Sequence, residues 1–248
     1  MRLQSIATAL NLRASPGGKV IGELRMGDVA ETPKKFFAKE WAEVAVTTGV
    51  SAGLKGFVRR KWLAQHFDAP PRLSGEDRTA AARIVAQRTH EFDAIAYGLG
   101  DKAKSWTALR GARRIDCSGW VYLMIGEILA AYGKKTPPGA FLSHSDDQVT
   151  RCGAGAECLI TAPYLQHTHF QPGVIVGLDY SEYSWDRGRA LDVDHVGIVG
   201  GDAGDLFFSQ SSSSGGGVNR VPLAKWLKSH DALARAGRMH VADLLALP

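Results

Sequence analysis

The sequence predicts a small all-β domain followed by a larger α+β domain. Residues 1–65 contain short runs of β-branched and aromatic residues separated by turn signals such as "SPGG" and "RMGD". From Thr79 the apolar residues recur at helical spacing, and after Gly173 they form short runs bounded by Gly and Asp. Residues 66–78 concentrate Pro, Gly, Ser and charge, as a linker does. We therefore expect a barrel or sandwich over 1–65, a linker over 66–78 and an α+β domain over 79–248.

The basic charge of the chain lies in its first quarter. The 248 residues carry a formal net charge of +5, and residues 1–68 hold 11 Lys and Arg against 6 Asp and Glu, whereas the remainder holds 19 of each. A modest basic surface favours anionic partners and is equally compatible with a solvated face. The chain begins without an apolar run of secretory length, and no later segment approaches the roughly 18 apolar residues of a membrane span. We therefore expect no membrane insertion and a cytoplasmic site of synthesis, from which a non-standard route could deliver the protein to the periplasm or outside the cell.

The second domain is expected to begin with helices and to continue with strands. One helix starts near Thr79, and another follows Asp116, its predicted N-cap, and ends at Gly133 before "KKTPP". Apolar residues recur at three- and four-residue steps from Cys117 to Tyr132. The segments "GVIVGL", "DHVGIVGG" and "DLFFSQ" predict short strands, and "LAKWLKSH" predicts a last helix. This order favours a sheet that packs against the Cys117 helix.

Cys117 lies at the first turn of that helix. The positive end of the helix dipole and the unpaired N–H groups there favour a thiolate and can hold an oxyanion, which suits a nucleophile. The alternative is a small buried apolar residue, the usual role of a free cysteine. A nucleophilic thiol also needs a general base within hydrogen-bond reach and a group that orients the base.

Among the eight histidines, His195 is the best candidate for the base. It begins the predicted strand "DHVGIVGG", so its ring can point out of the core toward a helix terminus. His167 and His169 have the spacing of strand-borne metal ligands, but a third ligand is not evident, and we expect no metal there. Four others are interpreted as surface or helix-face residues: His66, His90, His230 and His240.

Three sequence blocks carry a family resemblance. "DCSGWVYLMIGE", "DHVGIVGG" and "FFSQSSSSGGGV", in this order, resemble the motif blocks of the NlpC-type cell-wall cysteine peptidases, a papain-like family, over residues 79–230. The resemblance implies a papain-like domain with helices packed on an antiparallel sheet. It implies that Cys117 is the nucleophile, that His195 is the base and that Gln210, fifteen positions later, is the third residue. An amide oxygen can accept from the second imidazole nitrogen and so hold the tautomer and the ring.

The same resemblance implies a set of substrate-binding residues. Asp116 and Ser118 would bind the substrate peptide, the aspartate meeting a free α-amino group, although Asp116 also fits a pure N-cap. Tyr97 in "AIAYGLG" would line the pocket, although the Tyr-x-Trp-Gly-Gly pattern of the family is incomplete here. The segment "SSSSGGGV", residues 211–218, is expected to be a loop lining the site rather than a tether.

The first domain has a resemblance of its own. "ALNLRASPGGKVIGELRMGD", "WAEV" and "GFVRRKWL" are similar to the strands of a bacterial Src-homology-3 module, which implies a small Src-homology-3-like barrel. Such a module binds wall peptides or restricts the active site. Arg59, Arg60 and Lys61 would form a basic stripe for anionic wall polymers, or a solvated edge strand.

Together, the two resemblances imply a bacterial cysteine peptidase that hydrolyses peptidoglycan stem peptides or muropeptides, at the bond between γ-D-glutamate and a diamino acid such as meso-diaminopimelate. The rivals are an N-acetylmuramoyl-L-alanine amidase, a Cys/His acyltransferase on the same scaffold, and a non-catalytic wall-binding protein. We expect a monomer that needs no metal or organic cofactor and has no nucleic-acid partner.

Two questions stay open at the level of sequence. The enzyme could recycle wall fragments, act as a phage lysin or be a delivered toxin; recycling predicts a preference for fragments with a free N-terminal L-alanine. Cys152 and Cys158 in "CGAGAEC" could form a disulfide or remain free thiols.

Overall fold

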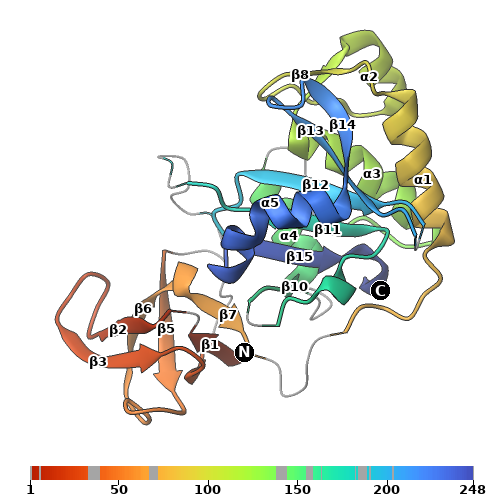
Figure 1. The fold of residues 1–248 in the computed structure, drawn as a ribbon. Helices are drawn as coiled ribbons and strands as arrows, with labels where there is room; N and C mark the ends of the chain where they lie inside the picture. The colour runs from red at the N-terminus through yellow and green to blue at the C-terminus, as the bar shows by residue number, and fades with distance from the viewer. Residues whose placement is uncertain are drawn as a thin grey trace.

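The chain forms two β-sheets, and helices flank the second of them (Figure 1). This computed structural model describes residues 2–5, 7–32, 40–66, 72–137, 144–154, 159–162, 164–181, 183, 189, 191–202 and 204–247. Among the described buried residues, the first sheet has a hydrophobic cluster of its own, and the second sheet has one cluster on each face.

Seven antiparallel strands form the first sheet, in the order β3-β2-β6-β5-β4-β1-β7. Alternate side chains fill its core, among them Leu12, Leu24 and Val58, because successive residues of a strand point to opposite faces. A short 3₁₀ helix, Arg60–Trp62, joins β6 to β7. The strands are β1 (Arg2–Ser5), β2 (Ala9–Arg13), β3 (Val20–Arg25), β4 (Val29–Glu31), β5 (Trp41–Val46), β6 (Lys55–Arg59) and β7 (Leu63–Gln65).

Eight strands form the second sheet, in the order β10-β15-β11-β12-β13-β14-β8-β9. All neighbours are antiparallel except β8 and β9, which are parallel. The strands are β8 (Ala96–Tyr97), β9 (Arg114–Ile115), β10 (Leu159–Ile160), β11 (Val174–Leu178), β12 (His195–Gly200), β13 (Phe207–Ser212), β14 (Gly217–Pro222) and β15 (Met239–Asp243). The three strands expected from the sequence are β11, β12 and β13. The Ser- and Gly-rich segment is not one loop but the end of β13, a tight turn and the start of β14.

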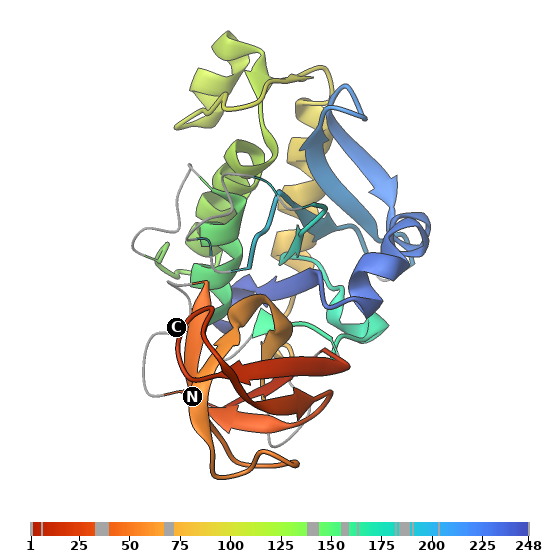
Figure 2. The same ribbon diagram turned by 90° about the vertical axis from the view of Figure 1, so that its left-hand side faces the viewer.

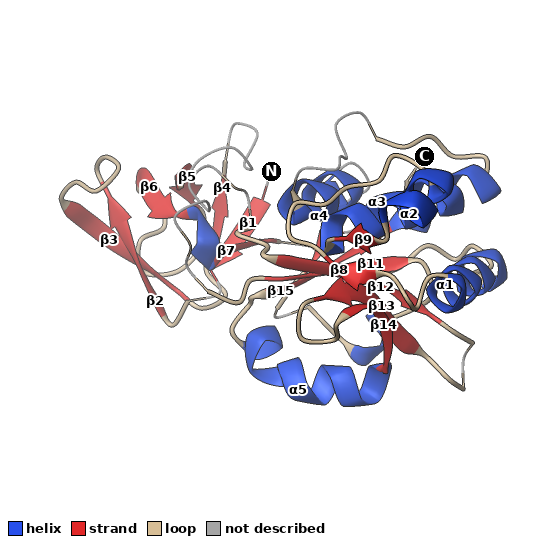
Figure 3. Ribbon diagram, turned by 90° about the horizontal axis from the view of Figure 1, so that it is seen from above, coloured by secondary structure: helices blue, strands red, loops and turns tan. Residues whose placement is uncertain are grey.

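Helices cover both faces of this sheet (Figure 3). Helices α1 (Thr79–Glu91) and α3 (Cys117–Ala131) pack on β12, and α4 (Ser145–Ala154) packs on β15. Helix α5 (Leu223–Arg235) packs on the opposite face, against β13, β14 and β15, and α2 (Trp106–Ala112) lies beside β9. Ile198 and Val199 show the alternation, since the first belongs to the cluster under α3 and the second to the cluster under α5.

Helix α3 is buried around most of its circumference, which sets the position of its first residue. Asp116 caps the helix by accepting a hydrogen bond from the Gly119 N–H at 2.7 Å. Trp120 is fully buried and donates from Nε1 to the Ser209 hydroxyl at 3.0 Å. At the other end, Gly133 adopts a left-handed conformation with φ of 66°, which stops the helix where the sequence predicts. Packing and caps therefore hold the Cys117 end of α3 in one place.

One expectation about the histidines is wrong, and the strand spacing considered for two others does not apply. His167–His169 forms a 3₁₀ helix rather than a strand, so these two side chains do not share a strand face. His240 lies on β15 and is buried, not on a polar helix. Within the described residues, no group of three or more His, Cys, Asp or Glu could hold a metal ion. The described helices likewise include none that is long and apolar enough to cross a membrane.

Figure 2 shows the first sheet, in red and orange, below the rest of the chain, and polar side chains connect the two parts. Arg60 is 2% exposed and donates from Nη2 to the Arg189 carbonyl at 2.8 Å, with Asp192 3.7 Å away. Gln4 accepts from the Tyr164 hydroxyl at 3.0 Å. The expected exposed basic stripe is therefore wrong at Arg60, which points into the protein because the carbonyl and the carboxylate there compensate its charge.

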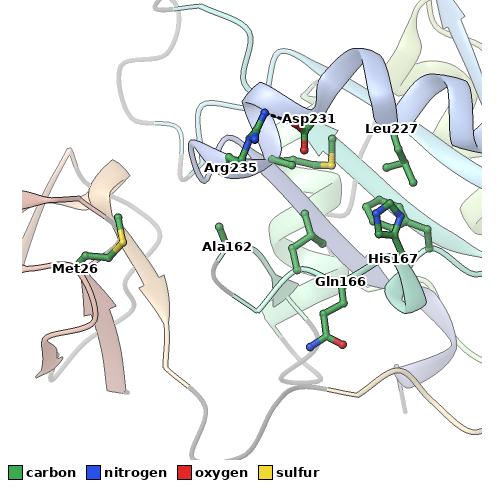
Figure 4. A pocket seen from close by; sticks show the side chains of 11 residues that line it. Met26, Ala162, Gln166, His167, Leu227, Asp231 and Arg235 are labelled. Carbon is green, nitrogen blue, oxygen red and sulfur yellow. Dashed lines mark ion pairs between the residues drawn. The ribbon is translucent and has the colours of Figure 1, made fainter.

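An apolar cavity of about 350 Å³ also lies between the two sheets (Figure 4). Met26 lines it from the turn after β3, and Leu227 and Arg235 line it from α5. Arg235 forms an ion pair with Asp231 at its edge. This cavity shares no lining residue with the one that contains His195.

The buried His240 makes stability depend on pH. Burial, and next the charge of Arg60, lower the pKa of His240 from 6.5 to about 3. The unfolded chain therefore binds one more proton between about pH 6.5 and about pH 3, so the free energy of unfolding falls as the pH falls through this range. We expect His240→Gln to reduce this loss by about 3 kcal/mol between neutral pH and about pH 4, measured by urea unfolding. Exposed His90→Gln is the matched control, and equal pH slopes for the two variants would contradict the prediction.

Candidate active site

Cys117 lies against the beginning of β12. The residue is 7% exposed, and the backbone N–H groups of Val196 and Ser118 lie close enough to its sulfur to act on the pKa of the thiol. Because Val196 directly follows His195, this contact brings the thiol to the strand end that carries the imidazole. Two residues 78 positions apart in the sequence therefore meet at one site.

The Cys117 thiol is protonated at rest. Burial raises its pKa above the ordinary value of 9.0, and the carboxylate of Asp116 raises it further. The Val196 N–H, the charge of Lys102 and the Ser118 N–H act in the opposite direction without reversing the shift. The helix start alone therefore does not produce a resting thiolate, and a general base is needed to activate this sulfur.

His195 is a neutral imidazole held by Gln210. Its Nε2 lies 2.6 Å from the Gln210 Oε1. Burial lowers its pKa from 6.5 to about 4, the bond to Gln210 opposes this shift, and the nearby His230 adds to it. A neutral ring can accept a proton near neutral pH, as a general base must.

A chain of amides fixes which ring nitrogen carries the proton. Asn219 donates from Nδ2 to the Gly217 carbonyl at 2.7 Å, and a carbonyl can only accept. The Asn219 Oδ1 therefore faces Gln210, whose Nε2 donates to it at 3.2 Å. The Gln210 Oε1 is then the atom that faces His195, so Nε2 of the ring is protonated and Nδ1 keeps its lone pair. Gln210 and Asn219 stand directly opposite each other in the β13–β14 register, which sets this alignment.

Asp116 and Ser118 lie beside the thiol in a polar cluster. Both are buried, and both accept hydrogen bonds from the ammonium of Lys102. Asp116 also accepts from the backbone N–H groups of Gly100 and Gly119. The N-cap role of Asp116 is therefore real, and its carboxylate is compensated by a lysine of the same chain.

The imidazole faces a cavity of about 320 Å³. Tyr97 lines it, and burial, followed by the charges that ionised Cys117 and Asp116 carry, raises the pKa of Tyr97 to about 12. Tyr180 also lines it, and its hydroxyl lies 2.9 Å from the His230 Nε2. His230, expected on the surface or on a helix face, lies on α5 and lines this cavity.

Helix α4 supports the loops that carry the site. Gln148 donates to the Ser118 carbonyl at 2.6 Å and so braces the start of α3. Asp146 accepts from the N–H groups of Leu191 and Val193, at 2.7 and 3.2 Å, in the segment before His195. These contacts hold the thiol and the imidazole from one rigid helix.

The structure adds four residues that the sequence did not single out for the site: Lys102, Tyr180, Asn219 and His230. Lys102 and Tyr180 lie in irregular segments without a periodic signal, and His230 is one polar residue of an amphipathic helix. Asn219 could have been found by pairing "FFSQSS" with "GVNRVP" as a hairpin, since that register sets it opposite Gln210.

The chain has two other cysteines, Cys152 and Cys158. Cys152 is a free, fully buried thiol on α4, and burial raises its pKa to about 12. Cys158 lies outside the described residues. A thiol with so high a pKa and no exposed surface is inert.

No protein-family model matches the chain, and no curated protein does. Solved structures similar to it include NlpC1 and NlpC2 of Trichomonas vaginalis, with 16% and 14% sequence identity and TM-scores of 0.35 and 0.38. The match covers 91% of this chain and 65% of NlpC1, and 90% of this chain and 68% of NlpC2. A Legionella pneumophila protein of the family model DUF1460 matches with 13% identity and a TM-score of 0.41, over 68% of this chain and 90% of that protein. The chain is thus similar to NlpC proteins at low identity and low TM-score, and it spans about two thirds of the length of NlpC1.

Proposed function

We propose that this chain is a cysteine peptidase that hydrolyses peptidoglycan stem peptides, at the bond between γ-D-glutamate and a diamino acid. The proposal is carried by the alignment of a thiol at the start of α3, an imidazole at the start of β12 and an amide on β13. This set supplies a nucleophile, a base and an orienting group. The choice of bond follows the resemblance of "DCSGWVYLMIGE", "DHVGIVGG" and "FFSQSSSSGGGV" to the NlpC-type peptidases.

In the proposed reaction, His195 Nδ1 takes the proton of the Cys117 thiol as the sulfur attacks the carbonyl carbon of the scissile amide. The tetrahedral intermediate collapses when the imidazolium gives this proton to the leaving nitrogen, which breaks the C–N bond and leaves a thioester. Water then attacks the thioester, His195 accepts a proton from the water, and the proton returns to the departing sulfur. The resting pair is neutral, so His195 acts as a true general base in the first step.

The oxyanion of the intermediate would be held by backbone N–H groups at the start of α3. The Gly119 N–H is already bound to the Asp116 carboxylate at 2.7 Å, so the donors would be those nearer the sulfur. The side-chain walls of the cavity, including Tyr97 and Tyr180, would bind the peptide on either side of the scissile bond.

Two features of the first sheet bear on its part in binding. Arg60 is buried between the sheets, which removes it from the surface that could bind anionic wall polymers. Trp62 and Tyr180 line a common cavity of about 390 Å³, and Tyr180 also lines the cavity of His195. These contacts favour a first sheet that limits what enters the site over one that binds the wall independently.

The products identify the reaction. Incubated with purified muropeptides, the wild type should release a fragment whose new amine is the α-amine of the diamino acid, detected by mass spectrometry. Cys117→Ala should lower the rate at least about 10³-fold, because the nucleophile is lost. Cys152→Ala is the matched control and should retain the rate. A new N-terminal L-alanine would identify an amidase instead, and intact peptides with unchanged wall binding would identify a binding protein.

A second prediction concerns Gln210. Gln210→Ala should lower kcat about 10- to 100-fold with little change in KM, because the ring is no longer held with Nδ1 toward the thiol. Gln210→Glu should keep an acceptor but raise the pKa of His195, since a carboxylate stabilises the imidazolium. The acid limb of kcat/KM, expected near pH 4 in the wild type, should therefore move to higher pH.

Gln171→Ala serves as the control, because among the described residues the Gln171 side chain donates to the Thr168 carbonyl, three residues away. Each variant is first compared with the wild type by circular dichroism at the pH of the assay. An unchanged acid limb in Gln210→Glu would show that Gln210 does not orient the base.

A further inference from the structure

The ammonium of Lys102 fills the acidic pocket beside the nucleophile. Its Nζ lies 2.6 and 2.5 Å from the two carboxylate oxygens of Asp116 and 2.5 Å from the Ser118 hydroxyl. The Lys102 side chain is 22% exposed and that of Asp116 is 6% exposed. The ammonium is thus a charge-assisted hydrogen-bond donor to both side chains, and removal of either charge would leave the other without compensation in a largely buried site.

The Asp116 carboxylate has no acceptor site left for another cation. Besides both contacts from Lys102, it accepts from the Gly119 N–H at 2.7 Å, from the Gly100 N–H at 3.1 Å and from the Ser118 hydroxyl at 3.2 Å. A carboxylate offers about four lone-pair positions, and these donors use all of them. A substrate ammonium could bind Asp116 only by displacing Lys102, and the two positive charges would repel each other.

The backbone holds Lys102 in this place. The segment that carries it follows β8 and is bonded to the chain just before α3, by the Gly98 N–H to the Ile115 carbonyl at 3.2 Å and by the Asp116 N–H to the Asp101 carbonyl at 3.0 Å. The next residue, Ala103, is buried at 2% exposure. The backbone of the lysine is therefore fixed beside Asp116, within reach of its carboxylate.

We propose that Lys102 is a specificity-determining residue: its ammonium takes the place of a substrate amino group at Asp116 and Ser118, so the site accepts stem peptides whose amino terminus is blocked, such as those still attached to the glycan. This inference rests on the proposed function and corrects the expectation that Asp116 meets a free α-amino group. It favours an enzyme that acts on glycan-linked wall peptides over one that recycles released fragments.

The same contact affects the nucleophile, which gives a readout independent of peptide cleavage. Lys102 lies close enough to Cys117 to lower the pKa of the thiol, whereas Asp116 raises it. Without the lysine, the Asp116 charge would be uncompensated one residue from the sulfur. Alkylation of Cys117 by iodoacetamide should then need a higher pH, because the thiolate is the reacting form.

The first experiment compares two synthetic substrates, L-Ala-γ-D-Glu-meso-diaminopimelate with a free amino terminus and the same peptide N-acetylated. The wild type should cleave the acetylated peptide at least as well as the free one. Lys102→Met keeps the apolar stem and removes the charge, so the ratio of kcat/KM for the free over the acetylated peptide should rise about tenfold or more. Lys104→Met, at an exposed neighbouring position, should leave the ratio unchanged. A wild type that prefers the free peptide about tenfold, or a Lys102→Met variant that loses both activities equally, would overturn the proposal.

The second experiment tests the pocket without substrate. In Lys102→Ala, added ethylammonium should raise the melting temperature and restore the wild-type pH profile of Cys117 alkylation, followed at Cys117 by peptide mapping. It should do neither in the wild type or in Lys104→Met. If ethylammonium acts equally on all three proteins, the pocket is not an ammonium site and the proposal is wrong. If the wild type cleaves neither peptide while ethylammonium rescues Lys102→Ala, the proposed function fails and the assignment of Lys102 as the cation of this pocket stands.

Discussion

The carboxylate of Asp116 is the constraint around which the site is built. This negative charge has almost no access to water, so hydrogen-bond donors must compensate it. Each of these donors connects another part of the chain to the residue next to the nucleophile. The Gly119 N–H makes Asp116 the cap of α3, the Gly100 N–H draws in the segment after β8, and Lys102 supplies the opposite charge. Gly119 also has to be glycine, because a Cβ there would lie 2.9 Å from Ile115 and 3.2 Å from the Asp101 carbonyl. The position of Cys117 follows from these contacts together with the burial of α3.

The second half of the site depends on strand pairing rather than on charge. His195, Gln210 and Asn219 come from three neighbouring strands, and the antiparallel register aligns their polar ends. Each amide side chain has one acceptor end and one donor end. The Gly217 carbonyl can only accept, so it fixes the orientation of the Asn219 amide, then that of the Gln210 amide, and through them the tautomer of the imidazole. A shift of one residue in the β13–β14 register would turn Asn219 to the other face and break the row.

The sequence predicts those parts of the site that local patterns encode. The helix that starts at Cys117 follows from its cap and its apolar period, and His195 and Gln210 follow from short strands that begin or end with a polar residue. The sequence does not predict the protonated state of Cys117, because burial by residues of β12 raises its pKa against the effect of the helix start. Nor does it predict that Lys102, rather than a ligand, compensates Asp116, since that pairing depends on how the segment after β8 docks on α3. His240 is wrongly expected on a helix for the same reason: which residues a segment buries against a distant element is a property of the tertiary structure.

The buried Arg60 has a consequence for the order in which the chain folds. The core of the first sheet and the two cores of the second share no described residue, so the first sheet can bury its own core without the second. The guanidinium of Arg60 must then stay hydrated until Arg189, 129 residues later, has been synthesised and its carbonyl can accept the hydrogen bond. Docking of the two sheets is therefore a late event that waits for the loop before the catalytic histidine candidate. A nascent chain stalled before that loop would hold a folded first sheet and no assembled site.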